Sequence, residues 1–175
     1  MRTAVVTGGA GFIGSHLVDL LLEEGFEVRA VDNLATGRLD NVAHHATHPR
    51  FSLYRADVCD LPADSPIFAG AELVFHFAGI GDIVPSIERP LDYMRANVAG
   101  TLAVLEASRR ARVGKLVYAA SSSCYGLARE VPTTETAPIE PRYPYALSKW
   151  LGECAVLHWA EVYRLPATSI RIFNA

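Results

Sequence analysis

Two residues four positions apart have side chains that could together transfer a proton. Tyr145 and Lys149 bound the segment Tyr145-Ala-Leu-Ser-Lys149, and residues at this spacing share one face of a helix. An ammonium group beside a phenol stabilises the phenolate, which is the form that a general base needs. The same spacing also occurs in many helices that carry a half-exposed Tyr beside a solvated Lys, so other residues must decide between these interpretations.

A run of serines supplies hydroxyl groups that could join this pair. The segment Ala120-Ser-Ser-Ser-Cys-Tyr-Gly126 directly follows an apolar stretch that predicts a strand. Ligands of open α/β sheets bind at the carboxyl ends of the strands. A serine at that edge could hydrogen-bond both a substrate oxygen and Tyr145; without the Tyr and the Lys, the serines would be interpreted as turn formers.

A glycine-rich segment near the N-terminus predicts a binding site for a diphosphate. Thr7-Gly-Gly-Ala-Gly-Phe-Ile-Gly14 satisfies both GxGxxG, with Gly9, Gly11 and Gly14, and GxxGxxG, with Gly8, Gly11 and Gly14. Glycines permit a tight turn and a close approach of backbone N–H groups to a pyrophosphate, and the following helix N-terminus favours negative charge. A glycine-rich turn without a ligand is the alternative.

Two aspartates refine the prediction for this ligand. Asp32 ends the next apolar run, at the offset where a carboxylate accepts hydrogen bonds from adenosine ribose hydroxyls. It would repel a 2′-phosphate, and no Arg follows it, so NAD is predicted rather than NADP. Asp57, with Val58, follows the third apolar run and could hold the adenine amino group, although a loop-capping Asp fits equally.

The elements that position these residues alternate along the chain. Short apolar runs predict strands, and helical spacing of apolar residues predicts helices in the gaps between them. This alternation predicts an α/β fold, a doubly wound parallel sheet of the Rossmann type, over residues 1–175. Two irregular stretches, 35–50 and 127–143, are interpreted as surface loops. The predicted strands are 3–7, 26–31, 51–56, 73–77, 115–120 and 168–173, and the clearest helices are 12–24, 91–111 and 145–163.

Composition excludes several classes of partner. The net charge of −3 over 175 residues, without a basic cluster, argues against nucleic acid. No apolar run reaches the roughly 20 residues that span a bilayer, so a cytoplasmic protein without a membrane partner is predicted. The three cysteines are widely spaced and are interpreted as reduced thiols. His44, His45 and His48 have spacings that a metal could use, but no acidic or Cys partner completes a set in the sequence, so no metal site is predicted.

The motifs together resemble those of the extended short-chain dehydrogenases, and among these the UDP-galactose and UDP-N-acetylhexosamine 4-epimerases. The resemblance covers nearly the whole chain. Its motifs are TGGAGFIGSH (7–16), VDN (31–33), AD (56–57), HFAG (76–79), NVAGT (97–101), SSSCYG (121–126), PYALSK (144–149) and RIFN (171–174).

The resemblance implies a role for each matching residue. Ser121 would be the catalytic hydroxyl, Tyr145 the base and Lys149 its electrostatic partner, which would also contact the nicotinamide ribose. Asn97 would support the active site. The cofactor NAD would contact Gly8, Gly11, Phe12, Ile13, Gly14, Asp32, Asn33, Asp57, Val58, Phe77, Ala78, Gly79, Asn97, Tyr145 and Lys149. The nucleotide sugar would contact Ser86, Ser121, Ser122, Ser123 and Asn174.

The reaction implied by the resemblance is reversible epimerisation at C4 of a UDP-linked sugar. Family 4,6-dehydratases and decarboxylases place acidic residues just after the catalytic hydroxyl, where this chain has Ser122 and Ser123. Because dehydration needs a carboxylate to move protons at C5 and C6, epimerisation is the simpler course. A dehydratase or decarboxylase of the same family remains the alternative, and a non-catalytic NAD-binding regulator is a second one.

Family members continue well past the RIFN segment with a sugar-nucleotide domain. We therefore expect that domain to be absent from residues 1–175, and we expect little or no turnover from these residues alone. An apolar flank beside the last strand is expected to be left uncovered. The helices predicted at 91–111 and 145–163 are the pair that relatives use for a four-helix interface, so the resemblance implies a homodimer.

Overall fold

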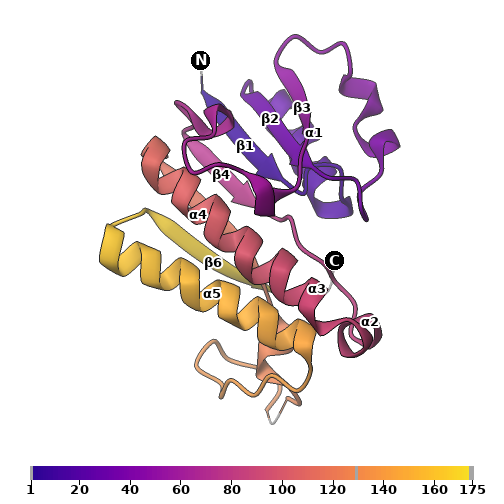
Figure 1. Ribbon diagram of the computed structural model, residues 1–175, viewed down its shortest axis with the longest axis vertical. Helices are drawn as coiled ribbons and strands as arrows, with labels where there is room; N and C mark the ends of the chain where they lie inside the picture. The colour runs from indigo at the N-terminus through magenta and orange to yellow at the C-terminus, as the bar shows by residue number, and fades with distance from the viewer. Residues whose placement is uncertain (1, 129, 174–175) are drawn as a thin grey trace.

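The protein contains one parallel sheet, described by a computed structural model for residues 2–128 and 130–173 (Figure 1). The strand order is β3-β2-β1-β4-β5-β6, and every neighbouring pair is parallel. This order is that of the doubly wound dinucleotide-binding fold, which confirms the predicted fold class. The strands are β1 (Thr3–Thr7), β2 (Glu27–Asp32), β3 (Phe51–Arg55), β4 (Leu73–His76), β5 (Lys115–Ser121) and β6 (Ala167–Ile172).

Alternate residues of β1, a central strand, pack into apolar clusters on opposite faces of the sheet. Ala4 and Val6 pack into one apolar cluster with α1 (Phe12–Glu23), whereas Val5 packs into the other cluster with residues of α4 (Gly100–Ala111) and α5 (Pro144–Tyr163). All five residues of β1 are buried, as expected of a strand covered on both faces.

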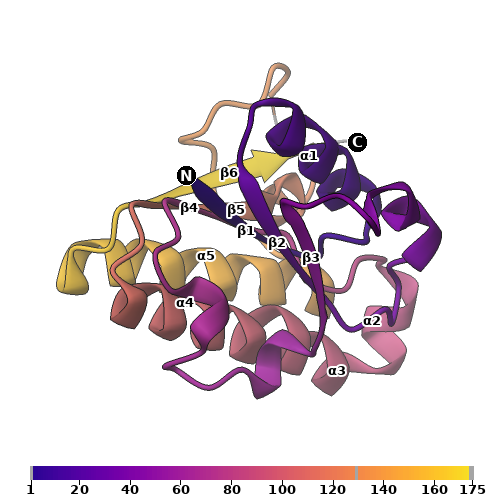
Figure 2. The same cartoon turned by 90° about the horizontal axis from the view of Figure 1, so that it is seen from above.

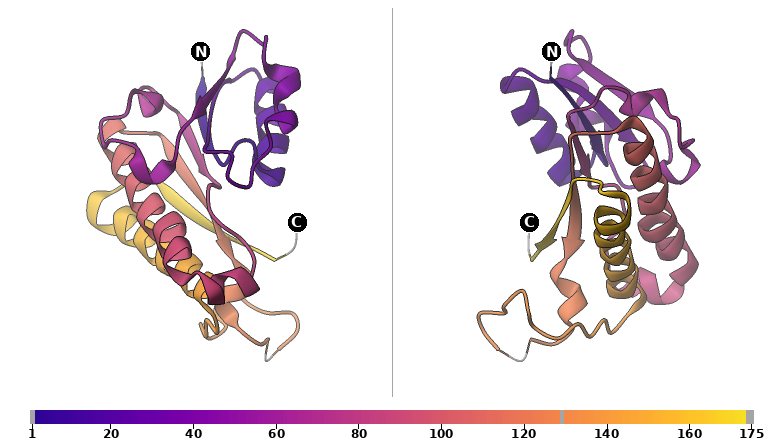
Figure 3. Two further views of the ribbon diagram at one scale, coloured as in Figure 1. Left: turned by 45° about the vertical axis from the view of Figure 1, so that its right-hand side comes forward. Right: turned by 90° about the vertical axis from the view of Figure 1, so that its left-hand side faces the viewer.

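Helices cover the two faces of the sheet unequally. Figures 2 and 3 show α1 on one face, and α3 (Pro90–Met94), α4 and α5 on the other. The strand order changes direction between β1 and β4, so the loops after these strands diverge and leave a crevice at the carboxyl edge of the sheet.

The predicted alternation of strand and helix is incomplete. Between β2 and β3 the described chain forms only the 3₁₀ turns η1 (Leu39–Asn41) and η2 (Ala43–His45), and between β3 and β4 only η3 (Val58–Asp60) and η4 (Pro66–Phe68). The segment 35–50 has no helical apolar period, which agrees with the predicted loop. Segment 127–143 is also irregular among its described residues and projects beyond the carboxyl ends of β5 and β6 (Figure 1).

The helix predicted at 91–111 contains an unpredicted irregularity. It is divided into α3, a π-helical turn η5 (Arg95–Ala99) and α4, with a short helix α2 (Val84–Glu88) before it. A π-turn inserts one extra residue, and such turns are frequent at functional sites. Within residues 2–128 and 130–173, no helix is long and apolar enough to cross a membrane.

Candidate functional site

The glycine turn is shaped by backbone atoms that leave no room for side chains. Gly8 has a φ of 71°, and a Cβ there would lie 2.7 Å from the backbone N of Ala78. A Cβ on Gly14 would overlap the carbonyl oxygen of Gly8. Gly8 and Gly14 therefore have no room for a side chain, and both belong to the GxxGxxG spacing. Gly9 instead faces the sheet, where its Cβ would lie 2.7 Å from that of Ala30.

Asp32 joins this turn to the loop that follows β2. One carboxylate oxygen accepts a hydrogen bond from the amide N of Ala10 at 2.9 Å, and the other from the amide N of Leu34 at 2.8 Å. A Cβ on Gly37 would lie 2.8 Å from the Asp32 carboxylate, so the loop passes directly over it. The acidic group is therefore fixed at the end of β2, beside the glycine turn, as predicted.

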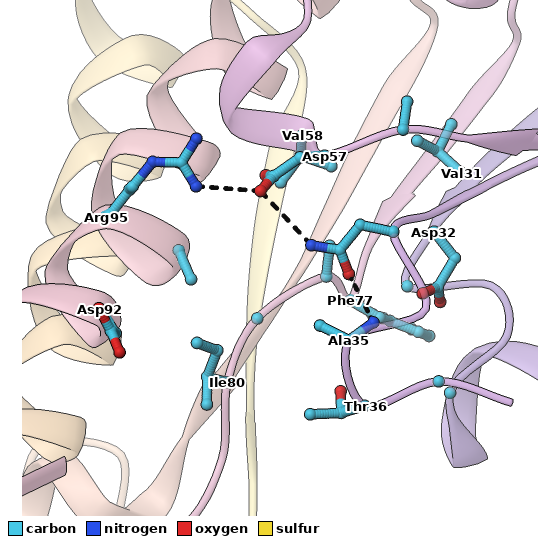
Figure 4. Close-up of a pocket in the computed structure, with 18 residues that line it drawn as sticks. Val31, Asp32, Ala35, Thr36, Asp57, Val58, Phe77, Ile80, Asp92 and Arg95 are labelled. Atoms are coloured by element: carbon cyan, nitrogen blue, oxygen red, sulfur yellow. Dashed lines mark hydrogen bonds and ion pairs between the residues drawn. The ribbon is translucent and has the colours of Figure 1, made fainter. Parts of the chain in front are cut away.

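Asp57 forms the opposite wall. Its carboxylate accepts a hydrogen bond from the amide N of Cys59 at 2.9 Å. It also accepts from Nη1 of Arg95 at 3.0 Å, a bond drawn in Figure 4, and from Nδ2 of Asn33 at 3.4 Å. Burial raises the pKa of Asp57, but the bonds from Cys59 and Arg95 outweigh this and hold the pKa below its ordinary value. Arg95 also pairs with Asp60 at 2.9 Å. Asp57 therefore caps the turn that follows it, as the loop-capping interpretation predicted, and it also lies at the site.

A cavity of about 290 Å³ lies between these walls (Figure 4). Its volume is close to the lower end of the range for small-molecule sites, about 300–1,000 Å³. The predicted residues that line it are Gly8, Gly11, Asp32, Asn33, Asp57, Val58, Phe77, Ala78 and Gly79. The residues that the sequence did not indicate are Val31, Ala35, Thr36, Gly37, Ala56, Ile80, Asp92, Arg95 and Ala96.

Six predicted cofactor residues do not line the cavity, namely Phe12, Ile13, Gly14, Asn97, Tyr145 and Lys149. Phe12 is 66% exposed and Ile13 is 37% exposed, and both lie in the first turn of α1. A contact from their backbone amides to a diphosphate therefore remains a prediction. The backbone cradle at Gly8, together with the fixed carboxylate of Asp32, fits the diphosphate and the adenosine ribose of NAD.

The predicted catalytic hydroxyls meet at the carboxyl edge of the sheet. The Tyr145 hydroxyl donates to Oγ of Ser121 at 3.4 Å. Ser121 is the last residue of β5, and its Oγ also accepts from the amide N of Ser123 at 3.2 Å. Tyr145 lies in the first turn of α5, whose first residue is Pro144, a proline position that helices favour. A strand end and a helix start thus bring together two residues 24 positions apart.

Lys149, one helical turn further along α5, is buried. Its Nζ lies 4.6 Å from the centroid of the Tyr118 ring and 3.9 Å from the point where a Cβ on Gly79 would stand. Burial lowers the pKa of Lys149 to about 8, and the charge of Glu153 partly opposes this shift. The ammonium group therefore extends from α5 toward the loop at Gly79, which lines the cavity.

Asn97 links the same loop to the same helix. Its Oδ1 accepts from the amide N of Ile80 at 2.8 Å, and its Nδ2 donates to the Ile80 carbonyl at 3.0 Å and to Oγ of Ser148 at 2.9 Å. The Ser148 hydroxyl donates in turn to the carbonyl of Tyr145 at 2.8 Å. Asn97 lies in the π-turn η5 and is buried, and its role in supporting the active site stays a prediction.

His76 is a functional candidate that the sequence did not reveal. Its ring is fully buried, with Nδ1 2.7 Å from Oγ1 of Thr7 and Nε2 2.9 Å from Oγ1 of Thr101. Because the Thr101 hydroxyl donates to the Asn97 carbonyl, Nε2 donates to Thr101 and Nδ1 accepts from Thr7. Thr7 then accepts from the amide N of Ala78 at 3.3 Å. Burial lowers the pKa of His76 to about 3, so the chain of hydrogen bonds contains a neutral imidazole.

The predicted substrate residues are only partly brought together. Ser122 and Ser123 form the 3₁₀ turn directly after Ser121 and are half-buried. Ser86 lies in α2, where its buried hydroxyl donates to the carbonyl of Ile83 at 2.6 Å, so a contact to a substrate stays a prediction. Asn174 lies outside the described residues.

The histidine segment has an acidic partner that the sequence did not indicate. Asp19 of α1 lies 2.6 Å from Nε2 of His45 and 3.0 Å from Nε2 of His44. The expectation that no acidic residue completes this set is therefore wrong. Nothing in the sequence connects an exposed face of α1 with a loop 25 residues further on.

The fold and the glycine cradle define a dinucleotide-binding α/β domain. The model of the NAD dependent epimerase/dehydratase family matches residues 4–175. The chain belongs to this family, and its cofactor is NAD.

Individual relatives agree with this assignment. The chain is 37% identical over 175 residues to a UDP-glucose 4-epimerase of Lacticaseibacillus casei, covering 98% of this chain and 51% of the relative. A UDP-N-acetylglucosamine 4-epimerase from Methanobrevibacter ruminantium, solved with UDP-N-acetylmuramic acid, has a TM-score of 0.92 at 30% identity, covering 97% of this chain and 54% of that one. A dTDP-glucose 4,6-dehydratase from Streptomyces venezuelae, solved with NAD, has a TM-score of 0.92 at 31% identity, covering 97% and 55%. The chain thus spans about half the length of these relatives.

Proposed function

We propose that the protein is an NAD-dependent nucleotide-sugar 4-epimerase acting on a UDP-linked hexose. The observation that carries this proposal is the hydrogen bond between Tyr145 and Ser121, at the carboxyl edge of the same sheet whose loops line the cofactor cavity. When bound, NAD supplies the acceptor for the C4 hydride and returns that hydride to the 4-keto sugar. The identities of the relatives support the same reaction.

The chain's own residues would handle the proton at the C4 oxygen. Tyr145, as phenolate, would remove the hydroxyl proton, and Ser121 would hydrogen-bond the same oxygen. Lys149 would stabilise the phenolate through its positive charge, since it lies one helical turn further along α5. Asn97 would hold the helix and the cofactor loop in register through its bonds to Ile80 and Ser148.

The positions after Ser121 favour epimerisation over dehydration. Ser122 and Ser123 carry hydroxyls, whereas proton transfer at C5 and C6 calls for a carboxylate. The likeness to a dTDP-glucose 4,6-dehydratase supports dehydration as the second candidate. Product analysis separates the two reactions, because dehydration yields a deoxy-keto sugar and epimerisation yields a sugar of unchanged mass.

A Tyr145→Phe substitution tests the proposal. In the full-length protein loaded with NAD, we expect UDP-glucose and UDP-galactose to interconvert, as followed by NMR. Loss of the general base should lower kcat by about 10²–10⁴-fold. Tyr163→Phe, at an exposed position at the end of α5, is the matched control and should retain full activity. Unchanged turnover in Tyr145→Phe, or a deoxy product from the unaltered protein, would reject 4-epimerisation by this residue.

We also propose a homodimer formed through α4 and α5. Three leucines of α5 have substantial exposure, at 39% for Leu147, 39% for Leu151 and 48% for Leu157. Exposed leucines on one long helix are what a four-helix interface would cover. Sedimentation of the full-length protein at twice the mass of one chain is the expected result.

A further inference from the structure

A second cluster of side chains lies on the outer face of α1, away from Ser121 and Tyr145. It consists of Asp19 from α1 and of His44 and His45 from η2. The Nε2 atoms of both imidazoles converge on the same carboxylate oxygen, at 3.0 Å for His44 and 2.6 Å for His45. One ligand atom from each of the three residues lies within 4.8 Å of the others.

From this convergence we propose that Asp19, His44 and His45 form a binding site for a divalent transition-metal ion such as Zn²⁺. Two imidazole nitrogens and one carboxylate oxygen are ligands that zinc takes in proteins, with water in the remaining position. A tetrahedral zinc ion with bonds of about 2.0–2.1 Å holds its ligand atoms roughly 3.4 Å apart. The carboxylate-to-imidazole distances of 2.6 and 3.0 Å are slightly shorter than that value, so small side-chain rotations that separate the three ligand atoms suffice to admit the ion.

The surroundings suit a cation with water ligands. The three residues line a cavity of about 380 Å³ together with Leu22, Glu23 and His48. The side chain of His45 is only 15% exposed, and that of Asp19 is 35% exposed, so two of the ligands are held by their neighbours. Burial raises the pKa of Asp19, but the hydrogen bonds from His45 and His44 hold it below its ordinary value and keep the carboxylate anionic.

A metal here would fasten a loop to the helix that follows the glycine turn. The loop already makes two hydrogen bonds to the turn. The amide N of Arg38 and Nδ2 of Asn41 both donate to the carbonyl of Ala10, at 3.0 and 2.8 Å. The same loop supplies Thr36 and Gly37 to the cofactor cavity. The role of the ion would therefore be structural, namely to hold this wall of the cavity against α1.

Calorimetric titration of EDTA-treated protein with ZnCl₂ tests the site. We expect one zinc ion per chain in the unaltered protein. The variants His45→Gln and Asp19→Asn should weaken binding at least about tenfold, since changes to groups that merely support a metal ligand already cost 10–100-fold. His158→Gln removes an exposed histidine from α5, far along the chain from the cluster, and should leave the affinity unchanged.

Two further measurements separate this site from binding by thiols and from loss of folding. Zinc should raise the Tm of the unaltered protein and of His158→Gln, but not that of His45→Gln, because the ion stabilises the state that binds it. Cobalt(II) in place of zinc should show no thiolate charge-transfer band, which excludes Cys59, Cys124 and Cys154 as ligands. Affinity weaker than about 1 mM, equal affinity in His45→Gln, or a thiolate band would each overturn the proposal.

Discussion

Lys149 has to carry a positive charge to stabilise a phenolate, yet the fold removes it from water. Burial lowers the pKa of Lys149 to about 8, and Glu153, one helical turn further along α5, raises it again in part. The ammonium form therefore predominates at neutral pH but not far above it. The balance between burial and one carboxylate sets the pH range in which this lysine can act.

Titration of the lysine side chains by NMR measures this balance directly. The chain has two lysines, Lys115 and Lys149, so ¹⁵N-labelled lysine gives two resolvable signals. We expect the Nζ signal of Lys149 to titrate near pH 8. Glu153→Gln should move this midpoint lower, because the carboxylate favours the charged form. A midpoint for Lys149 at or above 10 would contradict the burial argument.

The buried imidazole of His76 makes the free energy of unfolding depend on pH. Its folded pKa of about 3 lies below the ordinary value of 6.5, so the unfolded chain binds a proton that the folded chain excludes. The stability associated with His76 is fully present above pH 6.5 and is lost as the pH falls toward 3. The slope is at most about 1.4 kcal/mol per pH unit.

Urea unfolding at several pH values tests this contribution. In the unaltered protein, the free energy of unfolding should fall between pH 6.5 and pH 4.5. His76→Gln cannot take up the proton, so its free energy of unfolding should fall less steeply over the same range even if the variant is less stable overall. Parallel pH profiles for the two proteins would show that His76 does not carry the effect.

At the scale of elements, α5 approaches the sheet through a glycine. A Cβ on Gly152 would collide with the hydroxyl of Tyr118 and lie 3.0 Å from the carbonyl of Asn97. Neither neighbour is the free end of a flexible chain, because one is a buried phenol and the other is backbone. The close approach brings α5 beside both β5 and the π-turn, and so helps to place Tyr145 next to Ser121.

A Gly152→Ala substitution should therefore destabilise the protein. Overpacking costs about 1–3 kcal/mol, and the gain in helix propensity returns at most about 1 kcal/mol. Urea unfolding should show a lower midpoint for this variant. Gly81→Ala is the control, since a Cβ there meets nothing within 4 Å, and its midpoint should stay within error of the unaltered protein. Equal midpoints for both variants would mean that α5 shifts without strain.

The sequence predicted these elements better than it predicted their contacts. Apolar runs identify the strands because both faces of a parallel sheet are buried, and all six strands lie within one or two residues of the expected bounds. The π-turn at 95–99 was not predicted, because the one residue that it inserts hardly disturbs the apolar spacing over a helical segment as long as 91–111. Asp57 pairs with Arg95, the first residue of that turn, although the two lie 38 positions apart.

Some residues of the site could be predicted from their place in an element, whereas others depend on contacts between distant elements. Motif position predicted Ser121, Tyr145 and Lys149, since each lies at a strand end or on a helix face that the fold fixes. His76 was missed although it lies in a recognised motif, because its role depends on Thr7 and Thr101, which are 69 and 25 residues away. Contacts of this kind follow only from the three-dimensional arrangement.

At the scale of the whole molecule, the first part of the chain forms the cofactor cavity. Every residue that lines the cofactor cavity lies between Gly8 and Ala96, within one sheet and its loops. The hydroxyls of Ser121 and Tyr145, proposed as catalytic, lie at the same edge, but the chain spans about half the length of its relatives. A sugar nucleotide needs a surface that buries most of it, and the walls described for this chain belong to the dinucleotide site.

We therefore predict that residues 1–175 alone bind NAD but show little or no epimerase turnover. Calorimetry should give one NAD per chain, and Asp32→Ala should weaken binding by removing the carboxylate beside the ribose position. Adding UDP-glucose to the NAD-loaded chain should leave both the absorbance near 340 nm and the sugar unchanged, whereas the full-length protein should convert the sugar. Rapid interconversion by residues 1–175 would show that the sugar nucleotide needs no further protein surface. Failure to bind NAD would instead mean that the cradle at Gly8 and Asp32 forms only with the support of further protein surface.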